Sequence, residues 1–352
     1  MIFGKEYYES VWGGIHRHGT NHEHEPYWAE RLVSENGKCR ILDCGTGCGY
    51  LVKLLRDKGC DAWGVDSSDY AIANCCSPGY VLKASVTDLP FANDRFDVVF
   101  SCGLWEYLTL DEIAKGRDEI WRVGAKQIHN IDHDDTDFRK DFVTWKPLAW
   151  WNEQLAAPKV LVSCPTHECK EYSHQAWIDM ARSIDYPNYE ILVVDNSPTL
   201  DCYNRWKDKI PMIHIDTPTE WDSAQRVAAS MEIVRQKFLN ENFKWWFNVE
   251  TDVIPDPDAL KILIAHAGDW VGHAFPGRGQ TEQVSSGLGC SLFSRKIMED
   301  FTFVGAGDCN CKHVDAFFWD WVRPQNKYHV GEFWGRTTVR HLKEPEGTGY
   351  AS

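Results

Sequence analysis

The sequence predicts an α/β protein made of two domains that meet near residue 157. A length of 352 residues is typical of two or three domains, and a hydrophobic content of 43% is enough for two buried cores. Short apolar runs alternate with amphipathic segments, and a second series of such runs begins directly after Ala156-Ala157-Pro158. We therefore place the first domain at residues 1–157 and the second domain at residues 158–352.

The first domain is expected to hold a parallel sheet with helices packed against it. Its apolar runs predict strands at residues 40–43, 62–66, 80–84, 96–101 and 126–131. The segments between and after these runs predict helices at residues 50–58, 70–76 and 110–123. Because strand–helix–strand crossovers are right-handed, the loop after the first strand lies at the carboxyl edge of the sheet. The polar segment that ends at His24 is expected to be a loop.

The second domain is expected to be another layered α/β unit. Apolar runs predict strands at residues 159–163, 189–195 and 245–249, and helical patterns cover residues 173–183 and 223–239. Residues 255–258, with the sequence Pro-Asp-Pro-Asp, open a further helix, because both residue types are favoured at a helix N-terminus.

Composition and charge narrow the classes of partner. The formal net charge is −15 and neither half contains a basic run, so a nucleic-acid partner is not expected. No apolar run approaches about 20 residues, and no membrane span is predicted. The N-terminal residues have no secretory pattern, and the 13 cysteines are then expected to be reduced thiols in a cytoplasmic protein.

A glycine-rich loop follows the first predicted strand. Residues 43–49 read Asp-Cys-Gly-Thr-Gly-Cys-Gly, and glycines allow a tight turn and a close approach of backbone N–H groups to a ligand. The helix that begins near Gly49 adds its positive dipole end. Asp66 closes the second strand, where an acid accepts hydrogen bonds from ribose hydroxyls. These features predict a nucleotide-type ligand.

With its neighbouring motifs, this loop resembles the class I S-adenosylmethionine-dependent methyltransferases. Residues 65–68 resemble the family's second-strand acid motif, residues 86–91 its adenine segment, and residues 96–108 its fourth strand and following loop. The resemblance implies S-adenosylmethionine as cofactor, with Asp66 at the ribose, Asp88 at the adenine, and Gly45, Gly47 and Ser101 beside the methionine moiety. The full set of implied cofactor-binding residues is Asp43, Gly45, Gly47, Gly49, Asp66, Asp88 and Ser101.

The end of this domain departs from the family pattern. Class I methyltransferases usually finish with a strand hairpin after the fifth strand, whereas residues 132–157 lead through a Trp-rich segment into the second domain. The Rossmann-like sheet is therefore expected either to lack the final hairpin or to have its open edge covered. His129, Asp132 and His133 follow the fifth strand, where groups facing a methyl acceptor can lie.

Two acids follow a buried strand in the second domain. Glu250 and Asp252 come directly after the apolar residues 245–249. Side chains two apart in an extended chain point the same way, so both carboxylates can face one cation. Oxygen ligands suit Mg²⁺ or Mn²⁺, which neutralise a diphosphate leaving group in sugar transfer.

The second domain as a whole resembles the GT-A glycosyltransferases of the family-2-like group. Residues 160–166 resemble their nucleotide loop, residues 186–197 their second strand, residues 286–290 their acceptor segment and residues 314–318 the segment of their catalytic base. The resemblance implies a UDP- or GDP-type sugar donor bound by Pro165, Asp195, Glu250 and Asp252. It further implies a Mn²⁺ or Mg²⁺ ion held by Asp252, His341 and Glu250, and Asp315 as the base.

These resemblances lead to a hypothesis of a bifunctional glycan-modifying enzyme. One domain would transfer a sugar in an inverting reaction to a glycan or glycosylated acceptor, and the other would O-methylate that sugar or the acceptor. In an alternative, only the glycosyltransferase is active and the shortened methyltransferase is a scaffold. In a further alternative, the pair modifies a nucleic-acid base.

Overall fold

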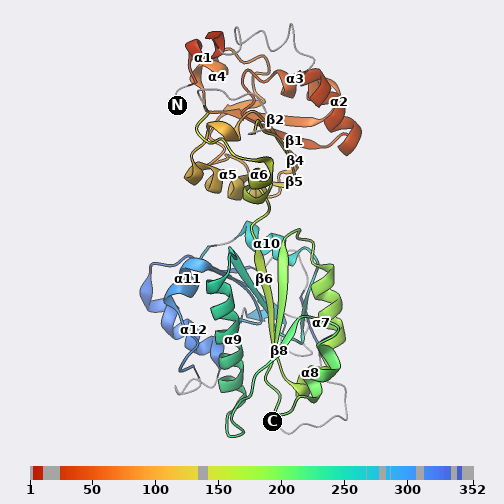
Figure 1. The fold of residues 1–352 in the computed structure, drawn as a ribbon, viewed down its shortest axis with the longest axis vertical. Helices are drawn as coiled ribbons and strands as arrows, with labels where there is room; N and C mark the ends of the chain where they lie inside the picture. The colour runs from red at the N-terminus through yellow and green to blue at the C-terminus, as the bar shows by residue number, and fades with distance from the viewer. Residues whose placement is uncertain are drawn as a thin grey trace. The chain divides into compact units, whose positions relative to one another are not determined.

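The chain folds into two compact units, Met1–Ala157 and Pro158–Ser352. Figure 1 shows both units of this computed structural model. The structure describes residues 3–10, 24–133, 142–266, 268–276, 283–285, 287–306, 313–333 and 339–342. Each unit contains helices and strands, so the predicted α/β class is confirmed.

The first unit is built on a parallel five-stranded sheet in the order β3-β2-β1-β4-β5. The strands are β1 (Arg40–Cys44), β2 (Asp61–Asp66), β3 (Val81–Lys83), β4 (Phe96–Cys102) and β5 (Gly124–Asn130). Every strand predicted for this part of the sequence is present within a few residues of its expected bounds. Among the described residues 131–133 and 142–157, no strand follows β5.

Helices cover both faces of this sheet. Residues of each strand point alternately to opposite faces, so each face presents apolar side chains that the helices bury. In β1, Ile41 belongs to a core formed with α2 (His24–Asn36) and α3 (Tyr50–Asp57). The next residue, Leu42, belongs to the opposite core, formed with α5 (Leu110–Val123) and α6 (Leu148–Gln154). The remaining helices are α1 (Lys5–Ser10), α4 (Asp69–Ala73) and the short 3-10 helix η2 (Trp105–Tyr107).

Helix α2 was not predicted. The expected loop extends instead into a helix that begins at His24, and its buried Trp28, Ala29 and Leu32 pack onto the sheet. These are few apolar residues in a polar stretch, and tertiary packing, not local pattern, stabilises the helix.

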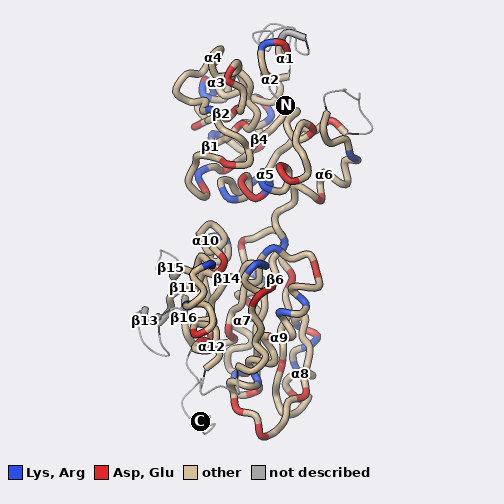
Figure 2. Tube along the Cα trace, turned by 90° about the vertical axis from the view of Figure 1, so that its left-hand side faces the viewer, with Lys and Arg blue, Asp and Glu red and all other residues tan. Residues whose placement is uncertain are grey.

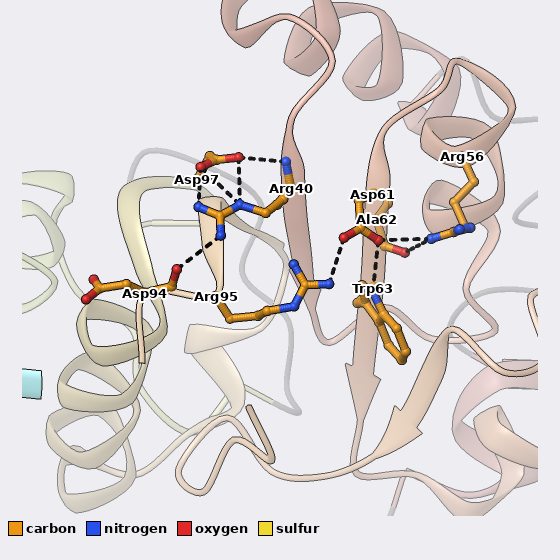
Figure 3. Close-up of polar contacts among 8 residues, drawn as sticks. All are labelled: Arg40, Arg56, Asp61, Ala62, Trp63, Asp94, Arg95 and Asp97. Atoms are coloured by element: carbon orange, nitrogen blue, oxygen red, sulfur yellow. Dashed lines mark hydrogen bonds and ion pairs between the residues drawn. The ribbon is translucent and has the colours of Figure 1, made fainter. Parts of the chain in front are cut away.

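Ion pairs tie strand ends together at the edge of the sheet where β1 and β2 begin (Figure 3). The Arg40 guanidinium lies 2.6 Å from the Asp97 carboxylate, and the Arg40 backbone N–H donates to the same carboxylate at 2.8 Å. Asp61 accepts from Arg95 at 2.7 Å and from the Trp63 indole at 3.1 Å. Half-exposed pairs of this kind contribute little free energy each, but together they fix the register of β1, β2 and β4.

The second unit contains a mixed seven-stranded sheet in the order β15-β11-β14-β9-β6-β7-β8. Its strands are β6 (Val160–Thr166), β7 (Tyr189–Asp195), β8 (Met212–His214), β9 (Trp245–Val249), β11 (Trp270–His273), β14 (Cys290–Ser294) and β15 (Val330–Phe333). The run β9-β6-β7-β8 is parallel, and β14 is antiparallel to both β9 and β11. Two small sheets pair β10 (Val253–Pro255) with β16 (Val339–His341) and β12 (Phe275–Pro276) with β13 (Gln283–Ser285).

Helices lie on both sides of this sheet (Figure 1). One side carries α9 (Ser223–Asn240), α11 (Arg295–Asp300) and α12 (Val314–Val322) over a large aromatic core. Trp246 lies within that core with no exposed surface, and its indole N–H donates to the Ser163 hydroxyl at 2.6 Å. The other side carries α7 (Glu171–Ser183) and α8 (Asp201–Trp206), and α10 (Ala259–Ala265) follows β10.

Charged residues of both signs are distributed along both units (Figure 2). This mixture accompanies the net charge of −15. Of the helices in the described segments, none has the length and hydropathy needed to cross a membrane.

The N-terminus of α5 gives the first prediction. The Thr109 hydroxyl accepts from the Glu112 backbone N–H while the Glu112 carboxylate accepts from the Thr109 backbone N–H at 2.9 Å, a complete capping box. We expect Thr109→Ala to lower the free energy of opening of α5 by about 1 kcal/mol. Hydrogen exchange of the peptides that cover α5 measures this change. Thr109→Ser keeps the capping hydroxyl and should exchange like the parent; equal protection in all three proteins would show that the cap contributes nothing.

Candidate functional site

A pocket of about 340 Å³ lies at the carboxyl edge of the first sheet. It is bordered by the ends of β1, β2, β4 and β5 and by residues of α1 and α2. Of the residues predicted to bind a cofactor, four line it: Asp43, Gly45, Gly47 and Asp66. Residues far apart in the sequence are thus brought to one cavity by the parallel order of the strands.

The glycine loop adopts a backbone that only glycine accommodates readily. Gly45, Gly47 and Gly49 all have positive φ, at 75°, 58° and 80°. A Cβ at Gly49 would lie 2.6 Å from a methyl group of Val81, so this glycine is also required for packing. Gly49 does not line the pocket; it precedes the first residue of α3.

Asp66 holds the loop in place. Its carboxylate accepts the Gly47 backbone N–H at 2.8 Å through one oxygen and the Ser68 backbone N–H at 2.8 Å through the other. The side chain is 8% exposed, and this burial raises the pKa of Asp66 above its ordinary value. Each carboxylate oxygen accepts more than one hydrogen bond, which leaves Asp66 able to bind a hydroxyl in the pocket.

Asp43 is the second acid of the pocket. It is almost fully buried, and burial raises the pKa of Asp43 from 3.8 to about 7. The Thr46 hydroxyl donates to the Asp43 carboxylate at 2.6 Å and offsets part of this shift. The nearby carboxylates of Asp66 and Glu25 raise the pKa further. A cationic ligand group would find here a carboxyl that it could ionise.

Two predicted cofactor-binding residues do not line the pocket. Asp88 is exposed on the turn that follows β3, although Ser85 and Val86 of the same segment are lining residues. Ser101 is fully buried behind the pocket wall, where its hydroxyl contacts the Trp105 indole at 2.9 Å and the His129 ring at 2.8 Å. Burial lowers the pKa of His129 to about 3, so its imidazole is neutral.

Aromatic residues at and just before the N-terminal helix α1 close one side of the pocket, and sequence reasoning missed them. Phe3, Tyr7 and Tyr8 are lining residues. The rings of Phe3 and Tyr7 pack edge-on against Tyr107, at centroid distances of 5.4 and 5.9 Å. The signal in the sequence was the cluster of aromatic residues Phe3, Tyr7 and Tyr8 near the N-terminus.

In the second unit, acidic and basic side chains converge beyond the end of β9. Asp252 is 1% exposed, and its Oδ2 lies 2.5 Å from the Lys170 ammonium, 3.1 Å from the Tyr172 hydroxyl and 3.5 Å from the His341 ring. The β10–β16 pairing places Val253 opposite His341, which explains how the late histidine reaches this position.

Glu250 and Asp315 complete the cluster. Burial, followed by repulsion from Asp315 and Asp252, raises the pKa of Glu250 from 4.5 to about 8, while His341 lowers it. Burial also raises the pKa of Asp315, and a hydrogen bond from the Leu288 backbone opposes that shift. A Cβ at Gly287 would lie 2.5 Å from the Asp315 carboxylate, so a glycine is needed beside it. The predicted residues Glu250, Asp252, Asp315 and His341 are therefore neighbours.

The donor set does not match the predicted Mn²⁺ or Mg²⁺ site. Among the described residues, no group of three or more His, Cys, Asp and Glu side chains is arranged to hold a metal ion. The physical reason is that Asp252 Oδ2 already accepts hydrogen bonds from the Lys170 ammonium and the Tyr172 hydroxyl. The metal-ligand roles predicted for Asp252, Glu250 and His341 thus receive no support from this geometry.

The two other residues predicted to bind a nucleotide sugar are enclosed. Asp195 has no exposed surface, and its carboxylate contacts the Ser197 hydroxyl at 2.5 Å and the His214 ring at 2.8 Å. Pro165 is buried in β6, and its carbonyl accepts from the Thr251 hydroxyl at 3.2 Å. That bond ties the segment between Glu250 and Asp252 to the end of β6.

Part of the chain matches a described protein family. Residues 42–127 match the family described as "Methyltransferase domain". This range contains the glycine loop, Asp66 and most of the parallel sheet. The first unit therefore contains a methyltransferase domain, which confirms that part of the sequence-based prediction.

Solved structures show weak likeness to the chain. Staphylococcus aureus TarS is 13% identical over 53% of this chain and 37% of that chain, with a TM-score of 0.38. TarS 1–349 in complex with UDP-GlcNAc is 11% identical over 55% of this chain and 62% of that one, with a TM-score of 0.35. The YcgJ protein of Bacillus subtilis is 18% identical over 38% of this chain and 66% of that one, with a TM-score of 0.31. The chain thus spans less than two thirds of each. No curated protein matches the sequence.

The acidic cluster of the second unit yields a prediction about protonation. Because Asp315 helps to raise the pKa of Glu250 above 4.5, we expect Asp315→Asn to lower that pKa while leaving it elevated by burial. NMR titration of ¹³C-labelled glutamate carboxyls measures the midpoint directly. Glu250→Gln identifies the resonance, and an unchanged midpoint in Asp315→Asn would contradict the expectation.

The same shift has a consequence for stability. The folded chain binds the Glu250 proton more tightly than the unfolded chain does, so this contribution to the free energy of unfolding is present below pH 4.5 and is lost as pH rises to about 8. Glu250→Gln should remove this part of the pH dependence.

Proposed function

We propose that the first unit binds S-adenosylmethionine in its pocket and transfers the methyl group to an acceptor. The observation that carries this proposal is the pocket itself, bordered by the Gly47 backbone and the Asp66 carboxylate inside a methyltransferase domain. Its volume of about 340 Å³ lies in the range of pockets that bury small ligands.

The residues of the pocket suit the parts of this cofactor. Asp66 accepts hydrogen bonds from the ribose hydroxyls while it holds Gly47. Asp43, whose pKa burial raises to about 7, ionises beside the ammonium group of the methionine moiety. Phe3, Tyr7 and Tyr8 cover the pocket and exclude water from the sulfonium. We place Asp88 and Ser101 outside direct contact with the cofactor, since neither lines the pocket.

A methyl acceptor must lose a proton when it is an alcohol. The titratable side chains of His24, Glu25 and Asp132 line the same pocket and are available to receive it. The sulfonium supplies an activated methyl group, and the pocket supplies alignment of the acceptor with it.

We further propose that the second unit transfers a sugar from a nucleotide donor. This proposal is supported by the convergence of Glu250, Asp252, Asp315 and His341, which the sequence resemblance had placed in separate motifs. Asp315 would be the base that takes the proton of the acceptor hydroxyl, because a buried carboxylate with a raised pKa is well suited to that step. Pro165 and Asp195, both enclosed, would support the nucleoside site from beneath at the ends of β6 and β7.

In this proposal, Lys170 and not a divalent ion carries the positive charge at Asp252. The ammonium lies 2.5 Å from Asp252 Oδ2 and is close enough to the carboxylate cluster to meet a phosphate there. Together the two units would form a bifunctional glycan-modifying enzyme, in which one transfers a UDP- or GDP-linked sugar and the other methylates the sugar or its acceptor.

Loss of one carboxylate tests the methyl-donor site. We expect Asp66→Asn to weaken binding of S-adenosylmethionine at least tenfold, because the ribose and the Gly47 N–H lose a charged acceptor. Isothermal calorimetry measures the dissociation constant. The matched control is Asp69→Asn, since Asp69 is exposed in the first turn of α4 and forms an ion pair with the exposed Lys83. Equal affinities of the two variants would contradict the assignment.

Donor turnover tests the second site. We expect Asp252→Asn to lower hydrolysis of a nucleotide sugar, screened as a UDP- and GDP-linked panel, at least a hundredfold, while Asp258→Asn in the exposed turn before α10 has no effect. Because the Lys170 ammonium binds the Asp252 carboxylate, the unmodified protein should hydrolyse the donor at the same rate in EDTA and in manganese. A rate that requires manganese would restore the metal site, and undiminished turnover in Asp252→Asn would overturn the proposal.

A further inference from the structure

Two cysteines meet at the glycine loop of the first unit. Cys48 lies between Gly47 and Gly49, is buried, and lines the pocket. Cys76 follows α4 and is exposed to solvent. Neither cysteine forms a disulfide in the structure, and 28 residues separate them in the sequence.

The backbone and the side chains hold these two residues together. The Cys76 backbone N–H donates to the Cys48 carbonyl at 2.9 Å, and the Cys76 thiol donates to the same carbonyl at 3.1 Å. Each thiol also has the largest influence on the pKa of the other, which places the two side chains close together. The adjacent Ser77 hydroxyl donates to the Gly49 carbonyl at 3.1 Å. The Cys76 backbone and its sulfur are thus both held against Cys48, the proximity that a disulfide requires.

The two thiols differ in the way that a redox pair requires. The hydrogen bond from Cys48 lowers the pKa of Cys76 from 9.0 to about 7, whereas that bond and burial raise the pKa of Cys48. An exposed thiol that ionises near neutral pH reacts first with an oxidant, and a neighbouring thiol then resolves the product.

We propose that Cys48 and Cys76 form a reversible disulfide that closes the cofactor pocket when a hydroperoxide is present. The Cys76 thiolate attacks the peroxide oxygen, the O–O bond breaks, and hydroxide leaves to give a sulfenic acid. The Cys48 sulfur then attacks the sulfenic sulfur, the S–O bond breaks, and water leaves as the S–S bond forms. In total, two thiols and one hydrogen peroxide become one disulfide and two waters, and a dithiol reverses the change.

The disulfide changes the pocket because Cys48 is part of its wall. The two sulfur atoms must approach each other to reach an S–S bond of about 2.05 Å. That movement draws the loop toward Cys76, while the neighbouring Gly47 N–H is held by Asp66 at 2.8 Å. The loop then loses the arrangement that borders the pocket, and affinity for the cofactor falls. This last step rests on the proposed methyl-donor site, whereas formation of the disulfide does not.

Peptide mapping of the full-length protein tests the bond itself. After treatment with hydrogen peroxide, we expect a Cys48–Cys76 linked peptide that disappears with dithiothreitol. It should be absent in Cys76→Ser and retained in Cys75→Ser, the matched control, because the Cys75 sulfur instead accepts from the Ser77 N–H at 3.3 Å. A linkage through Cys75, or no linkage at a tenfold excess of peroxide, would overturn the proposal.

Calorimetry on the same samples tests the effect on binding. We expect oxidation to weaken the binding of S-adenosylmethionine at least fivefold in the parent and in Cys75→Ser, with recovery after dithiothreitol. The affinity of Cys76→Ser for S-adenosylmethionine should not change on oxidation. A mapped disulfide with unchanged affinity would overturn the closure of the pocket. If the reduced parent does not bind S-adenosylmethionine, the methyl-donor proposal fails, and the mapping still decides whether the disulfide forms.

Discussion

The hydrogen bond between the Asp66 carboxylate and the Gly47 backbone N–H is the interaction on which the first unit's site depends. It joins the end of β2 to the loop after β1, and thereby fixes the positive-φ glycines that border the pocket. The parallel order of the sheet makes the bond possible, because β1 and β2 end side by side at the same edge. Burial of the carboxylate strengthens the bond and keeps competing water away.

The second unit brings several carboxylates into one cluster. Three carboxylates, those of Glu250, Asp252 and Asp315, lie close together, Asp252 buried and the other two partly buried, and such a cluster cannot hold three negative charges without compensation. Two effects compensate this charge: Lys170 pairs with Asp252, and the pKa of Glu250 is raised to about 8, which favours its neutral form. A site of this kind is prepared for a ligand that brings its own charge or for a proton taken from an acceptor.

Much of the fold could be predicted from the sequence because its strongest signals are local. Buried parallel strands such as β1 and β4 appear in the sequence as short apolar runs. The residues that cap the N-terminus of α5, Thr109 and Glu112, are three positions apart in the sequence. Helix α2 was missed because only tertiary packing of Trp28 and Leu32 stabilises it. Strands β11 and β14 were missed because they pair with each other from separate parts of the sequence. The hydrophobic pattern of each segment does not indicate which other segment it pairs with.

In the sites, too, local sequence patterns predict some features, whereas others depend on contacts between distant residues. Asp43, Gly47 and Asp66, which the motifs singled out, line one pocket, since they lie at or just after the ends of recognisable strands. The burial of Ser101 depends on Trp105 and His129, and the occupation of Asp252 depends on Lys170, 82 residues away. No pattern in the sequence reports such contacts between distant side chains.

The central claim, that the pocket of the first unit is a methyl-donor site, is tested most directly by a crystal structure of the full-length protein with S-adenosylhomocysteine. We expect the nucleoside in the pocket of about 340 Å³, with its ribose hydroxyls bonded to Asp66 and its amino-acid moiety beside Asp43 and Gly47. Density for the ligand elsewhere, or an empty pocket at a saturating ligand concentration, would contradict the account.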